Sequence, residues 1–133
     1  MKKYILLLVV LAAIITSGCF SNAEDGLLQG KVSIGPLSPV EMPGEGINID
    51  CDVYALRKIM VYDEEGERLI RQVDITCSSE ENRAYYQVWL EAGIYLVDIN
   101  HLGIDSSADV PKTVEITSGT TFKLDIDIDT GIR

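Results

Sequence analysis

Hydrophobic and polar residues alternate with a period of two along most of the chain beyond residue 26. Such alternation is typical of β-strands that bury one face. The pattern therefore predicts an all-β protein. The predicted strands cover residues 28–34, 58–62, 69–75, 86–90, 94–99, 114–116 and 122–128, and a weaker extended segment covers 47–53.

Segments rich in glycine and proline separate these strands. Asp63–Gly66 predicts a hairpin turn, and Glu91–Gly93 predicts a second, tight hairpin. Three prolines and three glycines make residues 35–46 a long loop, and residues 101–111 form another. About seven strands at near-regular spacing predict a single antiparallel β-sandwich over residues 27–133.

The N-terminus has the features of an export signal. Two lysines precede an apolar run from Tyr4 to Ile15, which is shorter than the ~20 residues of a membrane-spanning helix. Small residues follow it. We therefore expect residues 1–18 to be a signal peptide that precedes a short polar tether over residues 19–26.

The end of this signal resembles a lipobox, where a peptidase cuts before a cysteine that carries diacylglycerol. The residues are Thr16-Ser-Gly-Cys19, and Thr16 departs from the usual Leu, Val or Ile. The expected protein is a lipoprotein held through Cys19 to the cell membrane or outer membrane, facing the periplasm or the cell exterior. Cleavage after Ala23, giving a secreted protein, and an uncleaved anchor are the alternatives.

The mature chain is strongly acidic. Without the signal it keeps 9 basic and 21 acidic side chains, a net charge of −12. Nucleic acid and anionic lipid surfaces bind through Lys and Arg, so neither is an expected partner. A chain of 115 residues is long enough for one domain with its own core, and no cofactor is predicted.

Two cysteines remain when Cys19 is set aside. Cys51 and Cys77 lie equally far from the Asp63–Gly66 turn, so an antiparallel pair of strands would bring them nearly opposite one another. In an oxidising compartment this predicts a structural disulfide. The alternative, a redox-active or nucleophilic thiol, lacks a Cys-x-x-Cys motif and a neighbouring base.

Three segments resemble carboxypeptidase-regulatory-like domains, which share a transthyretin-like (prealbumin-like) sandwich. They are the first strand at Leu28–Val32, the run Tyr85–Val97 that is similar to a Y-x-V-x-L-x-x-G-x-Y-x-V hairpin, and the closing pair that begins at Val114–Gly119. Residues 34–41, 53–63, 95–105 and 124–133 also look like a group of small prokaryotic exported proteins of this type. The resemblance implies the fold, and an accessory, stalk or binding role rather than a reaction.

The C-terminal residues Asp125, Asp127 and Asp129 are the weak candidates for a metal site. Asp-x-Asp-x-Asp begins many calcium loops, but Thr130 stands where an EF-hand needs glycine. The alternation with isoleucine instead fits a strand, where same-face carboxylates are ~7 Å apart. We favour a solvated strand face, with a cation site as the alternative.

His101 is the chain's single histidine, and it lies in a loop with Asp98 and Asp105 nearby. A small hydrolase built on the His101–Asp105 loop is one possible function. No Gly-x-Ser-x-Gly elbow accompanies it, and zinc needs more ligands than remain once the cysteines pair. No catalytic residue is therefore predicted, and we favour a surface or turn role for His101.

Trp89 is in phase with Tyr85 and out of phase with Tyr86. Because a domain's single Trp usually packs, we favour a core position for Trp89. The alternative places Trp89 and Tyr85 on the outer face, as weak candidates for stacking on a sugar or docking a protein.

These features predict a non-enzymatic, envelope-associated lipoprotein that binds protein or glycan partners or spaces other envelope components. A cation-dependent adhesion module that uses the three C-terminal aspartates is one alternative function. A small hydrolase or accessory catalyst that uses the His101 loop is the other.

Overall fold

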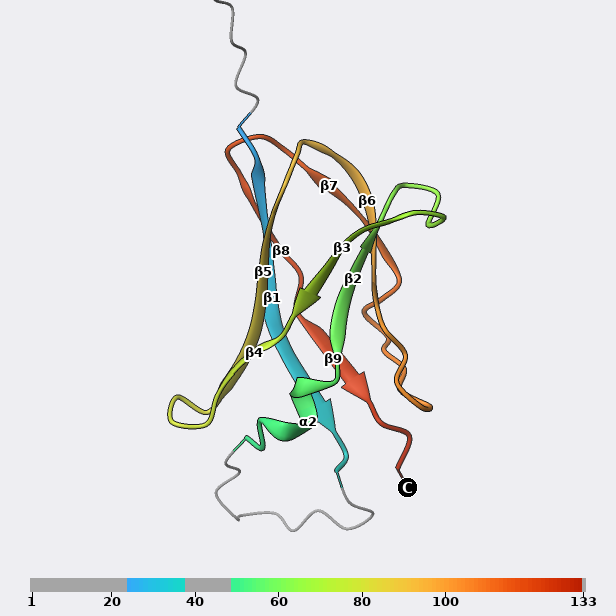
Figure 1. The fold of residues 1–133 in the computed structure, drawn as a ribbon. Coiled ribbons are helices and arrows are strands. Elements are labelled where there is room, and N and C mark those ends of the chain that lie inside the picture. The colour runs from blue at the N-terminus through green and yellow to red at the C-terminus, as the bar shows by residue number, and fades with distance from the viewer. Residues whose placement is uncertain (1–23, 38–48, 133) are drawn as a thin grey trace, which may run out of the picture.

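The computed structural model describes residues 24–37 and 49–132. They form two β-sheets that face each other across one hydrophobic core, so the predicted all-β sandwich is confirmed (Figure 1). The predicted signal peptide, the lipidation site Cys19, the cleavage site after Ala23 and most of the loop over 35–46 lie outside the described residues.

Sheet I is built around β1 (Gly26–Gly35). β5 (Arg83–Leu90) runs antiparallel to β1 on one side, and β4 (Thr76–Ser78) lies beyond β5. β8 (Thr121–Lys123) and then β9 (Ile126–Asp129) run parallel to β1 on its other side. The sandwich is therefore antiparallel except at this edge, where β8 and β9 run parallel to β1. Alternation specifies which face of a strand is buried, but it does not specify the strand's partner or direction.

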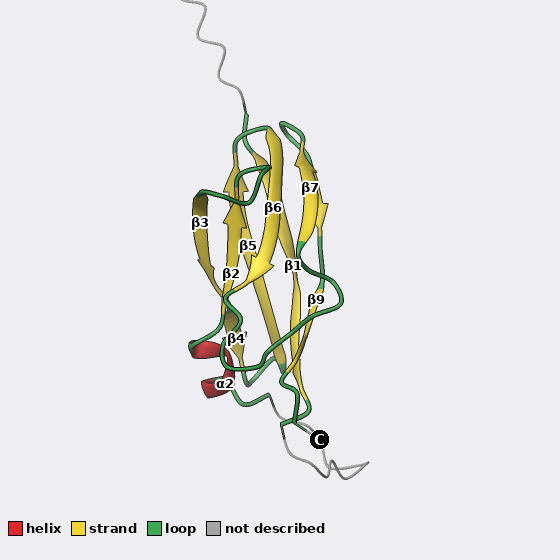
Figure 2. Cartoon of the chain, turned by 90° about the vertical axis from the view of Figure 1, so that its right-hand side faces the viewer, coloured by secondary structure: helices red, strands yellow, loops and turns green. Residues whose placement is uncertain are grey.

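Sheet II has the order β3-β2-β6-β7, and all its pairs are antiparallel. Figure 2 shows this sheet in front of sheet I. Its strands are β2 (Lys58–Tyr62), β3 (Leu69–Asp74), β6 (Gly93–Ile99) and β7 (Lys112–Ile116).

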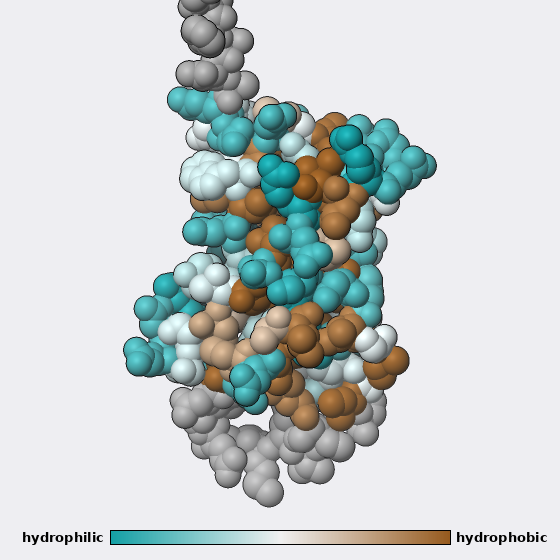
Figure 3. All heavy atoms as spheres, viewed as in Figure 1, coloured by the Kyte–Doolittle hydropathy of each residue, from teal (hydrophilic) through white to brown (hydrophobic). Residues whose placement is uncertain are grey.

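The β2–β3 hairpin turn lies where the sequence predicts it. Gly66 has φ +74° and its N–H donates to the Asp63 carbonyl at 3.0 Å. The Asp63 carboxylate accepts the backbone N–H groups of Glu67 (2.9 Å) and Arg68 (3.2 Å). These N–H groups, that of Arg68 first, lower the pKa of Asp63. The turn is the hydrophilic protrusion at the upper right of Figure 3.

The second predicted hairpin, at Glu91–Gly93, is wrong. β5 pairs with β1 in sheet I, for example Gln87 with Gln29, whereas β6 pairs with β2 in sheet II, for example Val97 with Val61. The short link carries the chain from one sheet to the other. β5 and β6 each bury one face. Two such strands can pair within one sheet, or they can lie in facing sheets with the core between them, and the alternation pattern is the same in both cases.

The buried residues follow the predicted phase of alternation. Tyr86 is fully buried, and its O–H donates to the Leu124 carbonyl at 2.7 Å. Burial raises the pKa of Tyr86. Both sheets contribute to this core, which includes Leu28, Val32, Ile59, Val61, Ala84, Leu90, Val97, Ile99, Val114, Ile116, Ile126 and Ile128.

The last predicted strand is divided into β8 and β9 at Leu124 and Asp125. The Leu124 N–H donates to the Gln29 carbonyl at 2.9 Å, and the Lys31 N–H donates to the Asp125 carboxylate at 2.9 Å. A side chain thus replaces a backbone acceptor at this step of the ladder. A Cβ at Gly30 would lie 1.8 Å from the Leu124 oxygen, so the strands approach this closely only because residue 30 is glycine.

The extended segment expected over 47–53 is wrong at its end, because Asp52–Ala55 forms one helical turn, α2. The Asp50 carboxylate accepts the Asp52 N–H at 3.0 Å, a local side-chain bond that favours a turn over a strand. Within residues 24–37 and 49–132, no helix has the length and apolar character needed to cross a bilayer.

Candidate functional site

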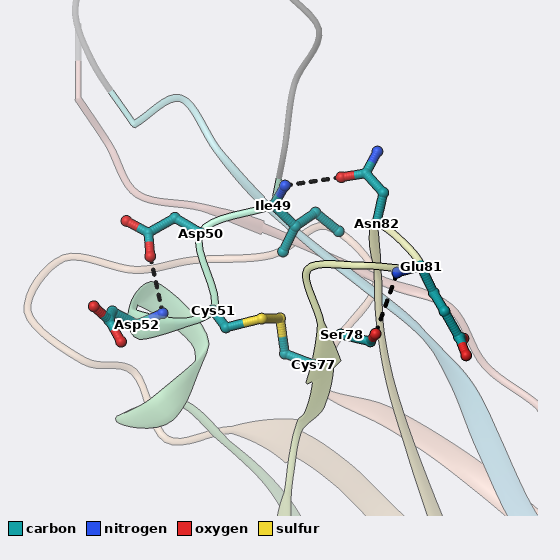
Figure 4. The surroundings of a disulfide bond; sticks show 8 residues. All are labelled: Ile49, Asp50, Cys51, Asp52, Cys77, Ser78, Glu81 and Asn82. Carbon is teal, nitrogen blue, oxygen red and sulfur yellow. Dashed lines mark hydrogen bonds between the residues drawn. A yellow bond between two sulfur atoms is a disulfide. The ribbon is translucent and has the colours of Figure 1, made fainter.

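Cys51 and Cys77 form the predicted disulfide, with their Cα atoms 5.6 Å apart. Figure 4 shows that it joins the start of α2 to β4 at the edge of sheet I. The Asn82 side chain accepts the Ile49 N–H at 2.8 Å, so the segment before α2 has a second attachment to the turn that follows β4. The disulfide is therefore part of the fold's framework.

The route by which the cysteines meet differs from the expected one. In the β2–β3 ladder Lys58 pairs with Asp74. If the same register continued to Cys51, its partner would be residue 81 and not Cys77. The chain leaves the ladder before the cysteines. α2 turns back toward the β4 edge, and the disulfide closes across that bend.

The C-terminal aspartates lie on the exposed face of the strand, as the favoured interpretation predicts. The Asp127 carboxylate accepts the Ser33 hydroxyl at 2.8 Å, and the Asp129 carboxylate accepts the Gly131 N–H at 2.8 Å. Asp125 accepts the Lys31 N–H. In the part of the chain that the structure describes, no three His, Cys, Asp or Glu side chains are grouped to hold a metal ion.

His101 connects the two ends of the loop that follows β6. Its Nε2 is 2.9 Å and 3.0 Å from the carboxylate oxygens of Asp98, and its Nδ1 is 3.2 Å from the Asp105 carbonyl oxygen. Both contacts are with acceptors, so both are satisfied only when the imidazole carries two protons. The Asp98 hydrogen bond, followed by that of Asp105, raises the pKa of His101.

Asp105 is buried, and its carboxylate pairs with Arg57. Only its backbone carbonyl contacts His101. The Arg57 Nε–Asp105 Oδ2 distance is 2.7 Å, and Nη2–Oδ1 is 3.2 Å. Arg57 also donates to the Val53 carbonyl at 2.6 Å, so it connects α2 with the loop. The sequence did not indicate this pair, because its members are 48 residues apart.

We expect the pKa of His101 to lie above the ordinary value of 6.5. The Asp98–His101 contact therefore stabilises the fold fully below the unfolded-state pKa, and the stabilisation is lost as pH rises through the folded-state pKa. An NMR titration of the single imidazole measures this directly. Asp98→Asn should return the pKa toward 6.5, whereas Asp74→Asn on β3 should leave it unchanged. A titration at or below 6.5 in the parent protein would contradict the contact.

The favoured core position for Trp89 is wrong. Trp89 is 60% exposed on the outer face of sheet I, whereas Tyr86 is in the core. Tyr85 shares the outer face and is half-buried, with the Arg83 guanidinium 4.9 Å from its ring centre. One face of the Tyr85 ring is thus occupied by a cation, and Trp89 is the more exposed of the two aromatic residues.

The strand register arranges the outer face of sheet I in rows. Trp89 and Thr121 flank Leu27 in the first row, and Gln87 and Lys123 flank Gln29 in the second. In the third, Lys31 pairs with Tyr85, which pairs with Thr76. Successive rows are ~7 Å apart, so the surface from Trp89 to Tyr85 extends for ~13 Å.

A shallow depression of about 400 Å³ lies over the second and third rows. Its lining includes three basic side chains together with two amides and an aromatic ring: Lys31, Arg83, Lys123, Gln29, Gln87 and Tyr85. The sequence alone does not reveal this group, because its members come from three separate strands. The signal that could have found it is the absence of Asp and Glu from those strands.

Comparisons with known proteins add no family to these observations. No model of a known protein family matches the chain. No curated protein is significantly similar to it in sequence.

Proposed function

We propose that the protein is a non-enzymatic exported lipoprotein whose β-sandwich is a binding module of the cell envelope, for a glycan or protein partner. Its contact surface is the outer face of sheet I, centred on Trp89. The module is of the transthyretin-like type that carboxypeptidase-regulatory-like domains represent. The resemblance of residues 28–32, 85–97 and 114–119 supports this assignment.

The observation that carries the proposal is the 60% exposure of Trp89 on a regular sheet. Across the ladder Trp89 pairs with Leu27, and the depression beside it is lined by Glu24, Asp25 and Thr121. A large aromatic side chain gains free energy when it is covered, and such residues are enriched where ligands and partner proteins bind. The position thus suits ligand contact better than it suits stability.

The position of Trp89 relative to the tether supports an envelope partner. Trp89 pairs with Leu27, eight residues after Cys19. Eight extended residues span at most about 29 Å. If Cys19 carries a lipid, Trp89 remains near the membrane surface, where envelope glycans and proteins are concentrated.

The two alternative functions receive less support from the geometry. Both ring nitrogens of His101 are directed at acceptors within the loop, so neither faces a position where a substrate proton could be removed. The C-terminal aspartates are engaged by Lys31, Ser33 and Gly131, and two of these three bonds hold β9 and the residue before it against β1.

Trp89 provides the test, because it is the chain's single tryptophan. The exported chain, purified with Cys19→Ser, is titrated with polysaccharide and protein fractions of the cell envelope. We expect one fraction to shift the Trp89 emission to shorter wavelength and to protect it from acrylamide quenching. Trp89→Ala, followed by co-sedimentation, should weaken retention by that fraction at least tenfold.

Ile104→Ala is the matched control. Ile104 is 74% exposed and lies beside Gly131, near the Gly35 end of β1, whereas Trp89 pairs with Leu27 at the other end of that strand. Ile104→Ala should leave retention of the protein by the envelope fraction within twofold of that of the parent protein. If no envelope fraction changes the Trp89 signal at any salt or calcium concentration, the proposal is wrong.

A further inference from the structure

Three neighbouring strands of sheet I carry basic residues without acidic ones, whereas the Asp residues of this sheet lie on β9. β1, β5 and β8 together contain three basic residues and no Asp or Glu, although the chain has 21 acidic residues. The three basic residues, Lys31, Arg83 and Lys123, all line the depression on the outer face. Charge of this sign, placed against the net charge of the chain, indicates selection for an anionic ligand.

The cations in this depression are accessible. Arg83 pairs with Glu81, and Lys123 lies 3.7 Å from Asp125. Both acidic partners are more than half exposed, and ion pairs of this kind contribute little, so an anionic group of a ligand can replace them. Lys31 has no ion pair to its ammonium group among residues 24–37 and 49–132. The Asp125 carboxylate accepts the backbone N–H of Lys31, not its ammonium group.

The remaining groups on this face favour a sugar chain over a small anion. Gln29 and Gln87 place amide groups between the cations and Trp89. Amides donate to and accept from hydroxyl groups, and an exposed indole stacks on the apolar face of a sugar ring. The surface from Trp89 to Tyr85, along β5, is ~13 Å long, which is longer than one sugar ring.

We propose that the outer face of sheet I binds an acidic polysaccharide, with Trp89 stacking on a sugar ring and Lys31, Arg83 and Lys123 holding its carboxylate groups. This inference rests on the proposed binding function and gives its ligand class. The carboxylates enter the depression, and the amides of Gln29 and Gln87 bond to the hydroxyl groups between them. Arg83 is held for this role by the Tyr85 ring beneath its guanidinium.

The test compares two polymers that differ only in charge. The purified chain with Cys19→Ser is titrated with polygalacturonate and with its fully methyl-esterified form, and Trp89 emission reports binding. We expect polygalacturonate to bind at least tenfold more tightly than the ester, with an affinity that falls as NaCl rises. Poly-glutamate, which has carboxylates but no sugar rings, should bind at least tenfold more weakly than polygalacturonate.

Two double variants separate the local effect of these charges from the net charge. Lys31→Gln with Lys123→Gln should weaken polygalacturonate binding at least tenfold. Lys58→Gln with Lys112→Gln removes the same charge from sheet II, away from Trp89, and should weaken it less than twofold. Far-ultraviolet circular dichroism confirms that both variants are folded.

Each contrary result has a distinct meaning. Equal binding of the ester, equal binding of poly-glutamate or equal loss in both double variants would overturn the acidic-polysaccharide inference. So would no binding of polygalacturonate at low salt. In any of these cases, Trp89-dependent retention by an envelope fraction would still support the proposed function. Loss of that retention as well would overturn both.

Discussion

Replacing Cys51 and Cys77 together by serine is expected to lower the free energy of unfolding by about 3.5 kcal/mol. The disulfide closes a loop with a sequence separation of 26, and the chain-entropy model gives this value for a loop of that length. The loop includes α2, β2 and β3, so opening it also releases α2 from the edge of sheet I. Urea unfolding followed by circular dichroism measures the change.

The reference for this measurement is the chain with Cys19→Ser, because a free Cys19 thiol could exchange with the disulfide. Dithiothreitol should destabilise the reference by a similar amount and leave the double-serine variant unchanged. Equal urea midpoints for the reference and the variant would show that the disulfide does not stabilise this fold.

Gly30→Ala is expected to destabilise the protein by about 3 kcal/mol, at the upper end of the usual cost of overpacking. The added Cβ would lie 1.8 Å from the Leu124 oxygen and 2.5 Å from the Leu124 carbonyl carbon. Both are backbone atoms, so no side chain can rotate away. β1 and the C-terminal strand must separate, which also disturbs the hydrogen bond from Tyr86 to Leu124.

Gly93→Ala is the matched control, because a Cβ there meets only the Tyr95 ring at 3.7 Å or beyond. Its effect should be within about 0.5 kcal/mol of zero. Thermal or urea unfolding of the two variants provides the comparison. A Gly30→Ala variant as stable as Gly93→Ala would show that the close contact between the strands is absent in solution.

The sequence allowed the strands and their buried faces to be predicted, because alternation reports directly on which side chains leave water. Leu28, Tyr86 and Ile126 are buried in the expected phase. It did not reveal how the strands are assembled. The Glu91–Gly93 link has the composition of a hairpin turn, yet it connects two sheets, because pairing depends on partners that are distant in sequence.

The candidate site was only partly predictable for the same reason. The phase of Trp89 relative to Tyr86 indicated its exposure, and the general tendency of a single Trp to pack led to the opposite preference. Lys31, Arg83 and Lys123 are up to 92 positions apart and become neighbours only through the β5-β1-β8 register. The parallel pairing of β1 with the C-terminal strands, which creates that register, has no local signature.

The central position of β1 determines how the domain would bear a mechanical load. β1 begins immediately after the tether region and is bonded to β5 on one side and to β8 and β9 on the other. A pull on its N-terminal end, directed along the strand away from the sandwich, acts in shear across both ladders. Their hydrogen bonds must then fail together rather than one after another from an edge. If Cys19 anchors the chain as we propose, the domain can hold an immobilised ligand under load while its sandwich remains folded.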